Sequence, residues 1–239
     1  MIREKGSVLM AKKGQQQRIV RRKKLLRASI HLFLKYGYEK TTTVSIAEEA
    51  GIAPPAFFTV YDDKEELLLD LVKIMFSNQF ENVGQFGKVS DDPVLLYSIE
   101  TSLLLYITEL SEPLREVYVL SYSLPNTSEY IYSSMPGRLQ EIFSKYMPDA
   151  KLKDFYEMEI ASAGIMRAYM AKPCDLYFTI KNKIMRFLQS SLTLYSVPKE
   201  VQAQIMDSVF KMDLRSCAEQ MIQKMAEIAE NDILLADDE

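Results

Sequence analysis

The sequence predicts an all-α protein with a small N-terminal helix-turn-helix domain and a larger helical domain. With 239 residues and 48% hydrophobic content, the chain can bury a sizeable core in two domains. Only eight glycines occur, and the alternation of apolar and polar residues that marks β-strands is almost absent. Residues 42–64 carry small and apolar residues at the spacing of two short helices joined by a tight corner.

About ten helices are expected. Pro93, Pro113 and Pro198 stand at or near predicted helix starts, where a missing N–H costs nothing. Residues 1–17 are expected to form a basic arm, disordered or partly ordered, ahead of a helix-turn-helix domain over residues 18–63. A larger helical domain takes up residues 64–239, with helices expected over residues 64–86, 93–110, 113–123, 127–146, 151–171, 176–196 and 198–231.

The first helix of the helix-turn-helix is expected over residues 43–50. Thr42 or Thr43 can cap it, because a threonine hydroxyl accepts a hydrogen bond from a free backbone N–H of the first turn. Ala47 is small where a second helix must cross closely, and Gly51 can take the left-handed conformation that ends a helix. These two residues make the tight corner between the helices.

The second helix is expected to place Ile52, Phe57 and Val60 on its apolar side, packed steeply across the first. Upstream, residues 18–36 have a broad apolar face that stops at Gly37. A helix over these residues would cover the two short helices and complete a small core.

Several spaced elements stand in register over residues 18–69: LF, a glycine, TT, IA, AG, an aromatic pair and KE-LL. Together they resemble the N-terminal pattern of the TetR/AcrR family of bacterial transcription regulators. The resemblance implies a sequence-specific DNA-binding regulator, a homodimer that represses from a palindromic operator and is released by a small apolar or amphipathic effector. It also implies that residues 64–239 bind the effector and form the dimer.

The charge distribution independently indicates contact with nucleic acid. Residues 1–40 contain twelve Lys or Arg and two Glu, a balance of +10, whereas the whole chain carries −4, so residues 41–239 carry −14. A basic end on an acidic body suits a protein that touches phosphate with one part. The alternative is a solvated tail, which is the usual role of a charge run. As an arm, residues 1–17 would enter a minor groove.

The expected recognition helix differs from the family pattern at its start. Ala53, Pro54 and Pro55 replace the Ser, Lys and Gly of many members, and a residue before proline avoids the helical region. Pro54 is therefore expected as the cap and Pro55 as the first residue of a very short helix. Residues 53–61 contain no Lys, Arg, Asn or Gln, the side chains that best read base edges, so direct base contacts should be few.

The DNA-binding candidates differ in role. Thr59 can hydrogen-bond a base, while Ala56 and the two prolines can contact thymine methyl groups. Phe58 stands where the family often has a tyrosine that reaches phosphate, and Tyr61 is a candidate for either core or contact. Lys64 and the two threonines match phosphate contacts of the family, with plain capping as the threonines' alternative. The predicted DNA-binding residues are Thr42, Thr43, Ala53, Pro54, Pro55, Ala56, Phe58, Thr59, Tyr61, Lys64, Arg18, Arg21 and Arg22.

Tyrosine and methionine residues on the central helices suggest an effector pocket. A tyrosine ring is flat and apolar with one hydroxyl, and methionine adapts its shape, so together they suit an apolar effector. Ordinary core packing is the alternative for each residue. The predicted pocket residues are Tyr97, Tyr106, Tyr118, Tyr122, Tyr130, Tyr156, Met158, Met166 and Tyr169.

Residues 151–170 and 176–195 align with the last two helices of the family, which implies a four-helix bundle between two protomers. The first range offers small or apolar residues and the second an apolar stripe at helical spacing, and packing within one chain is the alternative. The predicted interface residues are Ile160, Ala163, Gly164, Ala168, Ile184, Phe187, Leu188, Ser191 and Leu192. Residues 198–239 continue past the usual family end, and the sequence assigns them no role.

Two other function classes were weighed. A DNA-binding protein of this fold without a small-molecule effector, regulated by a protein partner or organising DNA, is the alternative to the regulator. An enzyme is not expected, because the chain has one histidine, His31, and neither a P-loop nor a nucleophile elbow. No cofactor, metal or membrane is expected, since Cys174 and Cys217 lack metal-binding spacing and no apolar run reaches about 18 residues. The expected location is the cytoplasm, with nucleoid association when DNA is bound.

Overall fold

The computed structural model describes residues 2–77 and 91–230, and the side chains of residues 14–76 and 91–227. These residues form eleven α-helices, one 3₁₀ helix and no strand, which confirms the all-α prediction. They divide into two compact units. The first contains the chain up to Leu68 and the end of the last helix from Lys224, and the second contains Leu69–Gln223.

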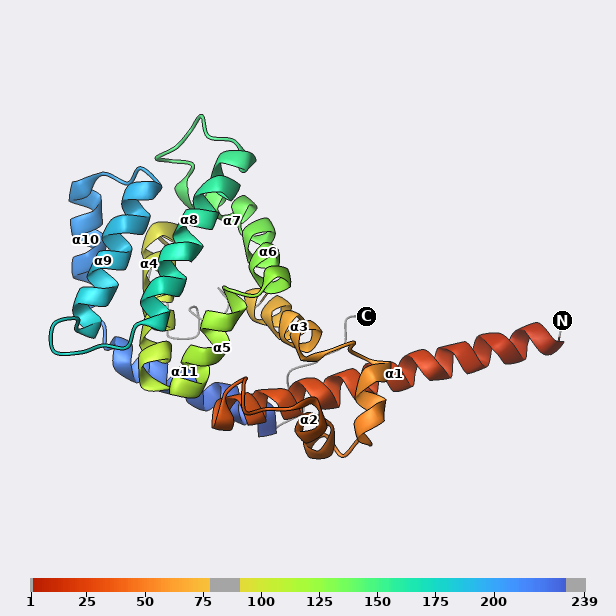
Figure 1. Ribbon diagram of the computed structural model, residues 1–239. Helices are drawn as coiled ribbons and strands as arrows, with labels where there is room; N and C mark the ends of the chain where they lie inside the picture. Colours follow the sequence, from red (N-terminus) through yellow and green to blue (C-terminus); the bar gives the residue numbers. More distant parts are fainter. Residues whose placement is uncertain (1, 78–90, 231–239) are drawn as a thin grey trace. The chain divides into compact units, whose positions relative to one another are not determined.

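The first unit holds the predicted helix-turn-helix (Figure 1). Its elements are α1 (Ile2–Tyr36), α2 (Thr43–Glu49), the 3₁₀ helix η1 (Pro54–Thr59) and the beginning of α3 (Lys64–Ser77). Helix α2 packs against both α1 and η1. Gly37, at φ 79°, ends α1 as expected, and Gly51, at φ 64°, turns the chain after α2. The buried apolar side chains include Leu25, Leu26, Phe33, Ile46, Ala47, Phe57, Val60, Tyr61, Leu67 and Leu68.

Helix α1 is longer than the sequence analysis predicted. It begins at Ile2 rather than Arg18, so residues 2–17, expected as a disordered or partly ordered arm, continue the helix (Figure 1). The predicted start at Arg18 follows from where the apolar face begins. An apolar face is needed for packing, but a helix can form its backbone hydrogen bonds without one. The stretch has no proline, and its glutamines, lysines and arginines are good helix formers.

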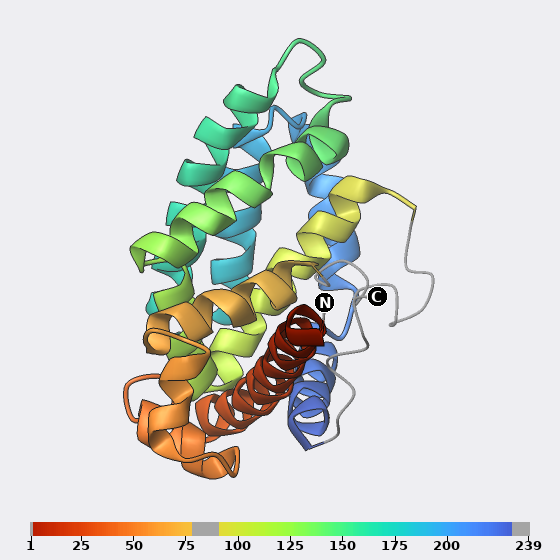
Figure 2. The ribbon, with the colours of Figure 1, turned by 90° about the vertical axis from the view of Figure 1, so that its right-hand side faces the viewer.

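The second unit is a bundle in which α4 is central (Figure 1 and Figure 2). It packs against α5, α7, α8, α9 and α10. Its helices are α4 (Pro93–Leu110), α5 (Glu112–Ser121), α6 (Pro125–Ser134), α7 (Pro136–Phe143), α8 (Leu152–Ala171), α9 (Ile180–Leu194), α10 (Lys199–Phe210) and the larger part of α11 (Leu214–Glu230).

Two predicted helices are each divided in the structure. The range 127–146 forms α6 and α7, because Pro136 interrupts the hydrogen-bond ladder. The range 198–231 forms α10 and α11, and the break follows from Asp213, whose carboxylate accepts the N–H of Ser216 at 3.1 Å and caps the second helix. Of the helix predicted over residues 64–86, the part from residue 78 lies outside the described residues.

Helix α4 is the one described helix that is long and apolar enough to span a membrane. It has 18 residues with a mean hydropathy of 1.2, although the sequence analysis found no such run. Two-thirds of it, 67%, is buried inside the protein, and it carries Glu100 and Glu109. Its composition is therefore that of a central core helix.

Replacing Gly51 with alanine should lower the free energy of unfolding by about 1 kcal/mol, because a residue with a Cβ is strained at φ 64°. Space is not the reason, since a Cβ there meets no atom within 4 Å. The matched control is Gly137→Ala, also in open space but within helix α7, which should be neutral or stabilising. Urea unfolding followed by circular dichroism compares the two, and equal effects would contradict the left-handed assignment.

Candidate DNA interface and ligand pocket

A capping box fixes the start of α2. The hydroxyl of Thr42 accepts the N–H of Ser45 at 3.0 Å, and the Ser45 hydroxyl accepts the N–H of Thr42 at 2.9 Å. Thr42 is therefore the cap, as one of the two predicted alternatives held. Its side chain is exposed while that of Thr43 is half-buried. The N-terminal end of α2 thus presents both threonines at or near the surface.

The recognition element is a 3₁₀ helix. Pro54 and Pro55 have no N–H to donate, and the first turn closes with a bond from the Ala56 N–H to the Ala53 carbonyl at 2.8 Å. Ala53 is the cap, with ψ 133°, and Pro54 is the first helical residue. The predicted cap at Pro54 was wrong by one residue: both Ala53 and Pro54 precede a proline, and it is Ala53 that takes the extended conformation while Pro54 joins the helix.

Contacts with α1 hold this short helix in place. The Phe57 side chain is fully buried, with no exposed surface. Arg18 donates from Nη2 to the Val60 carbonyl at 3.3 Å, and Arg21 donates from Nη1 to the Thr59 hydroxyl at 3.2 Å. The Thr59 hydroxyl in turn donates to the Ala56 carbonyl at 2.6 Å. Two of the predicted DNA-binding arginines therefore also support the recognition element, while Arg22 is half-buried beside them.

The exposed face of η1 is mostly apolar. Ala53, Pro55 and Thr59 are exposed, and Phe58 is the largest exposed side chain, with 58% of its surface accessible. Pro54 and Ala56 are half-buried. A surface of this kind offers contact area and one hydroxyl, which fits the prediction that polar base contacts are few.

Two predicted contacts are structural. Tyr61 is only 4% exposed, and its ring lies 5.8 Å from that of Phe57, so it belongs to the core and cannot reach DNA. Lys64 donates from Nζ to the carbonyls of Tyr38 and Thr41, both at 2.8 Å, and lies 3.9 Å from the Tyr38 ring centre. It joins the start of α3 to the turn before α2, so its ammonium group has a structural role.

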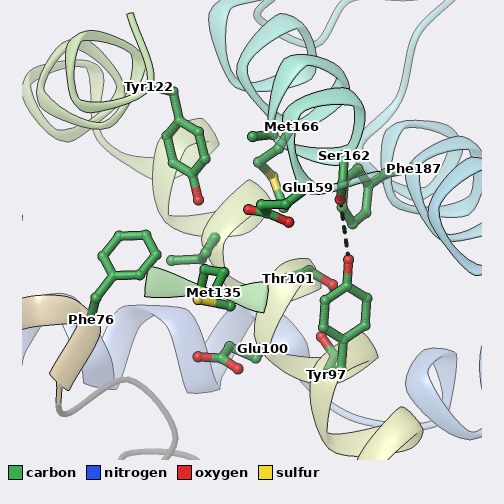
Figure 3. Close-up of a pocket in the computed structure, with 12 residues that line it drawn as sticks. Phe76, Tyr97, Glu100, Thr101, Tyr122, Met135, Glu159, Ser162, Met166 and Phe187 are labelled. Atoms are coloured by element: carbon green, nitrogen blue, oxygen red, sulfur yellow. Dashed lines mark hydrogen bonds between the residues drawn. The ribbon is translucent and has the colours of Figure 1, made fainter. Parts of the chain in front are cut away.

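The second unit contains a pocket that opens to solvent, with a cavity volume of about 30 Å³, which is room for about two water molecules. Figure 3 shows the Tyr122 hydroxyl and the Glu159 carboxyl pointing toward one another across it. The lining residues are Phe76, Tyr97, Glu100, Thr101, Leu104, Tyr122, Met135, Glu159, Ser162, Ala163, Met166 and Phe187.

Three of the nine predicted pocket residues, Tyr97, Tyr122 and Met166, line this pocket. The others lie elsewhere: Tyr118 is buried in the core, and Tyr169 packs on Phe178 with ring centres 5.7 Å apart. The four that remain sit on other surfaces of their helices, and they are Tyr106, Tyr130, Tyr156 and Met158. These six residues do not line this pocket, because helical spacing alone does not show which face meets a cavity.

A buried polar network forms one wall of the pocket. The Tyr97 hydroxyl shares hydrogen bonds with Ser191 at 2.6 Å and Ser162 at 3.4 Å. The Tyr195 hydroxyl donates to Glu159 Oε2 at 3.3 Å. Burial raises the pKa of Glu159 from 4.5 to about 8, and the Tyr195 bond opposes this only partly. Glu159 is therefore protonated in most molecules at neutral pH.

The sequence analysis missed the two acids, Glu100 and Glu159, that line the pocket. They are 4% and 6% exposed, respectively. A signal was present, since Glu159 lies four residues from both Phe155 and Ala163, which are buried on the same face of α8. A carboxyl group at a core position of an amphipathic helix is uncommon and indicates a special site.

The predicted dimer residues separate into two groups. The stripe on α9 is buried in the core of its own chain, so it cannot contact a partner, and the intrachain alternative is correct for it: Ile184, Phe187, Leu188, Ser191 and Leu192. Ala163 on α8 is buried in the same core. On the outer face of α8, Ile160 is 42% exposed, Ala168 is exposed and Gly164 is half-buried.

Together these features define a helix-turn-helix protein with a larger helical domain that contains a pocket. Residues 25–71 match the family described as bacterial regulatory proteins, tetR family. The N-terminal domain of this chain belongs to that family. The match agrees with the helix-turn-helix domain that the sequence predicts over these residues.

Similar proteins support this assignment. The uncharacterized HTH-type transcriptional regulator YuxN of Bacillus subtilis strain 168 is 25% identical over 180 residues, 68% of this chain and 61% of the relative. The HTH-type transcriptional regulator TcmR of Streptomyces glaucescens is 43% identical over 58 residues, 23% of this chain and 26% of the relative. The chain thus spans less than two-thirds of either relative.

A solved structure has the same fold over most of the chain. The crystal structure of RolR in complex with the ligand resorcinol aligns with a TM-score of 0.61, covering 82% of this chain and 95% of RolR. At 14% identity, the likeness concerns the fold alone.

The stability of the protein should fall as pH rises from about 5 to 8. Glu159 has a higher pKa in the folded chain, about 8, than in the unfolded chain, so folding favours its protonated form. Its contribution is complete below pH 4.5 and is lost as pH rises through 8, at up to about 1.4 kcal/mol per pH unit. Glu159→Gln should remove this slope and Glu157→Gln, an exposed control on the same helix, should keep it. Urea unfolding across this range measures both, and a slope unchanged by Glu159→Gln would contradict the assignment.

Proposed function

We propose that this protein is a sequence-specific DNA-binding transcriptional regulator that represses as a homodimer and leaves its operator when a small apolar or amphipathic effector binds. The observation that carries the proposal is the exposed face of η1, held on α1 and α2 within a tetR-family domain. The basic balance of +10 over residues 1–40 supplies phosphate attraction beside it. The corresponding location is the cytoplasm, with nucleoid association when DNA is bound.

The pocket favours a regulator that binds an effector over a DNA-binding protein that has no effector. Its walls combine aromatic rings and thioethers with a few polar groups, which is the lining typical of small-molecule sites. The structural relative RolR is described with the ligand resorcinol, a small aromatic molecule with two hydroxyls. Helix α3 runs without interruption from Lys64, in the first unit, to Phe76, which lines the pocket. Movement of that helix is a direct route from effector to DNA register.

A dimer follows from the small reading surface. One η1 of six residues makes few contacts, whereas two copies read two half-sites about one helical turn apart on a palindromic operator. The outer face of α8, with the exposed Ile160 and Ala168 and the small Gly164, suits close helix packing with a symmetry mate. The α9 residues that contact the partner then come from its outward side, not from the buried stripe.

Selection of bound fragments from a random DNA pool tests the proposal directly. The expected result is a palindromic site whose half-site centres lie about 10 base pairs apart or a multiple of that spacing. Recovery of no preferred sequence would contradict sequence-specific regulation. If a site is recovered but no compound in a ligand panel releases the protein from it, the alternative without an effector is favoured.

Removing residues 1–17 should weaken operator binding and flatten its salt dependence. Four Lys or Arg and one Glu lie in that stretch, and each phosphate contact contributes a slope of about 0.9 to the plot of log affinity against log salt. The matched control replaces only the four basic residues, as R3Q/K5Q/K12Q/K13Q, which keeps the chain length. Fluorescence anisotropy at several salt concentrations measures both, and an unchanged slope in either variant would assign the arm no phosphate contact.

Thymine methyl groups should carry part of the sequence preference. Uracil in place of thymine at contacted half-site positions should weaken binding about fourfold per methyl, because each buried methyl is worth about 0.8 kcal/mol. Phe58→Ala should reduce this difference, since Phe58 provides the largest exposed apolar surface of η1. Uracil outside the half-sites is the control. Equal affinity for thymine and uracil at every half-site position would show that the apolar face does not read methyl groups.

A further inference from the structure

Glu159 is a pocket residue without a cationic partner among the described side chains. It lies on α8, is 6% exposed, and receives one hydrogen bond, from the Tyr195 hydroxyl at 3.3 Å. When ionised, this carboxylate would offer about four acceptor positions, and the Tyr195 bond fills only one of them. Its carboxyl group points into the pocket, toward the Tyr122 hydroxyl (Figure 3). A buried acid with so few internal partners is placed to receive a donor from a ligand.

The surroundings of Glu159 are acidic or neutral. Glu100, 4% exposed, lines the same pocket from α4. Its charge interacts with that of Arg138 on α7. The groups that face Glu159 itself are the hydroxyls of Tyr97, Tyr122 and Tyr195. Burial raises the pKa of all three tyrosines above the usual 10, so they remain neutral at physiological pH. The described side chains that line the pocket therefore include two carboxyl groups and no cation.

The remaining walls suit a flat apolar body. Phe76, Tyr122 and Phe187 supply rings, and Met135 and Met166 supply thioethers that adapt to the shape of a ligand. Aromatic faces also attract cations, so the same walls tolerate an ammonium group near the carboxyls.

We propose that this pocket binds an amphipathic amine, with its ammonium group paired to the Glu159 carboxylate and its aromatic or hydrocarbon body between the rings and thioethers. The proposal rests on the effector function above and names the chemical class of the effector.

Binding of this kind releases a proton. In the free protein Glu159 is a neutral acid, because burial holds its pKa at about 8. The protonated ligand forms the pair while the carboxyl proton leaves to solvent, so that charge and atoms balance. At pH 7 the release is about 0.9 proton per ligand. An alkylamine stays protonated through this range, as lysine does. The amine affinity should therefore rise about fiftyfold between pH 6 and pH 8 and level above pH 9.

Three probes that share one body separate the possibilities: 4-phenylbutylamine, 4-phenylbutan-1-ol and 4-phenylbutyrate. Isothermal titration of the full chain at pH 8 should show the amine binding at least tenfold more tightly than the alcohol, with no binding of the carboxylate. Titrations at pH 7 in two buffers of different ionisation enthalpy should give close to one proton released with the amine and none with the alcohol.

Variants assign the effect to one side chain. Glu159→Gln keeps an oxygen that can accept from Tyr195, and should lose both the preference for amine over alcohol and the proton release while still binding the alcohol. Glu157→Gln, an exposed residue on α8, should change neither. Thermal unfolding of each variant checks that it is folded.

An alcohol that binds as tightly as the amine, or a preference unchanged by Glu159→Gln, overturns the proposal, as does binding of none of the three probes. Release of operator DNA by the alcohol alone would keep the effector function while overturning the amine class. If the protein shows no specific DNA binding when no compound is present, the proposed regulator function is wrong.

Discussion

The burial of Phe57 is the contact on which the DNA-binding surface depends. The 3₁₀ helix η1 begins with two prolines and has only six residues, so its own hydrogen bonds cannot define its position. Full burial of a phenylalanine side chain contributes about 2 kcal/mol, and Phe57 anchors η1 in the core of the first unit, where η1 packs against α2. The hydrogen bonds from Arg18 and Arg21 on α1 then fix the orientation of η1. Every exposed side chain of the recognition face is placed by these few interactions.

This arrangement accounts for the character of the reading surface. A longer recognition helix could turn several polar side chains toward base edges, but η1 exposes one hydroxyl, on Thr59, beside apolar groups. That hydroxyl already donates to the Ala56 carbonyl and accepts from Arg21. Affinity must then come chiefly from phosphate contacts and the spacing of two half-sites, with shape and methyl contacts refining the preference.

The pocket imposes a different balance on the second unit. An isolated carboxylate in a protein interior is expensive, and Glu159 avoids the cost by holding its proton. A hydrogen bond between the Tyr97 and Ser191 hydroxyls and one from Tyr195 to Glu159 satisfy polar groups on one wall of the cavity. The rings of Phe143 and Tyr195 stack with centres 4.2 Å apart behind this network, which makes that wall rigid. Packing alone would be better served by an apolar residue at position 159.

Local signals in the sequence predicted the helix-turn-helix well. Three of its roles depend only on local properties of the residue and not on what packs against it: the cap at Thr42, the small side chain of Ala47 and the left-handed backbone of Gly51. Prediction failed where a side chain's role depends on what packs against it. The α9 stripe had the correct period, yet the period does not say whether α4 and α10 of the same chain or a second protomer covers it. Lys64 matched a phosphate contact, but the carbonyls that bind it become neighbours only after folding.

The pocket was the least predictable part for the same reason. It is lined from six helices or their ends, and two of its acids stand inside otherwise apolar segments. Aromatic content pointed to the correct helices, and Tyr97, Tyr122 and Met166 were correct, whereas a cavity is defined by the gap that several elements leave between them. No single segment of the sequence contains that information.

The central claim is that one protein couples a DNA site to a ligand site, and coupling of this kind is reciprocal. The most direct measurement is a pair of titrations: operator affinity with and without saturating effector, and effector affinity with and without saturating operator. Both affinities should fall by the same factor, at least about fivefold, as coupling energies of 1 kcal/mol or more require. Operator affinity that is independent of a ligand shown to occupy the pocket would contradict it.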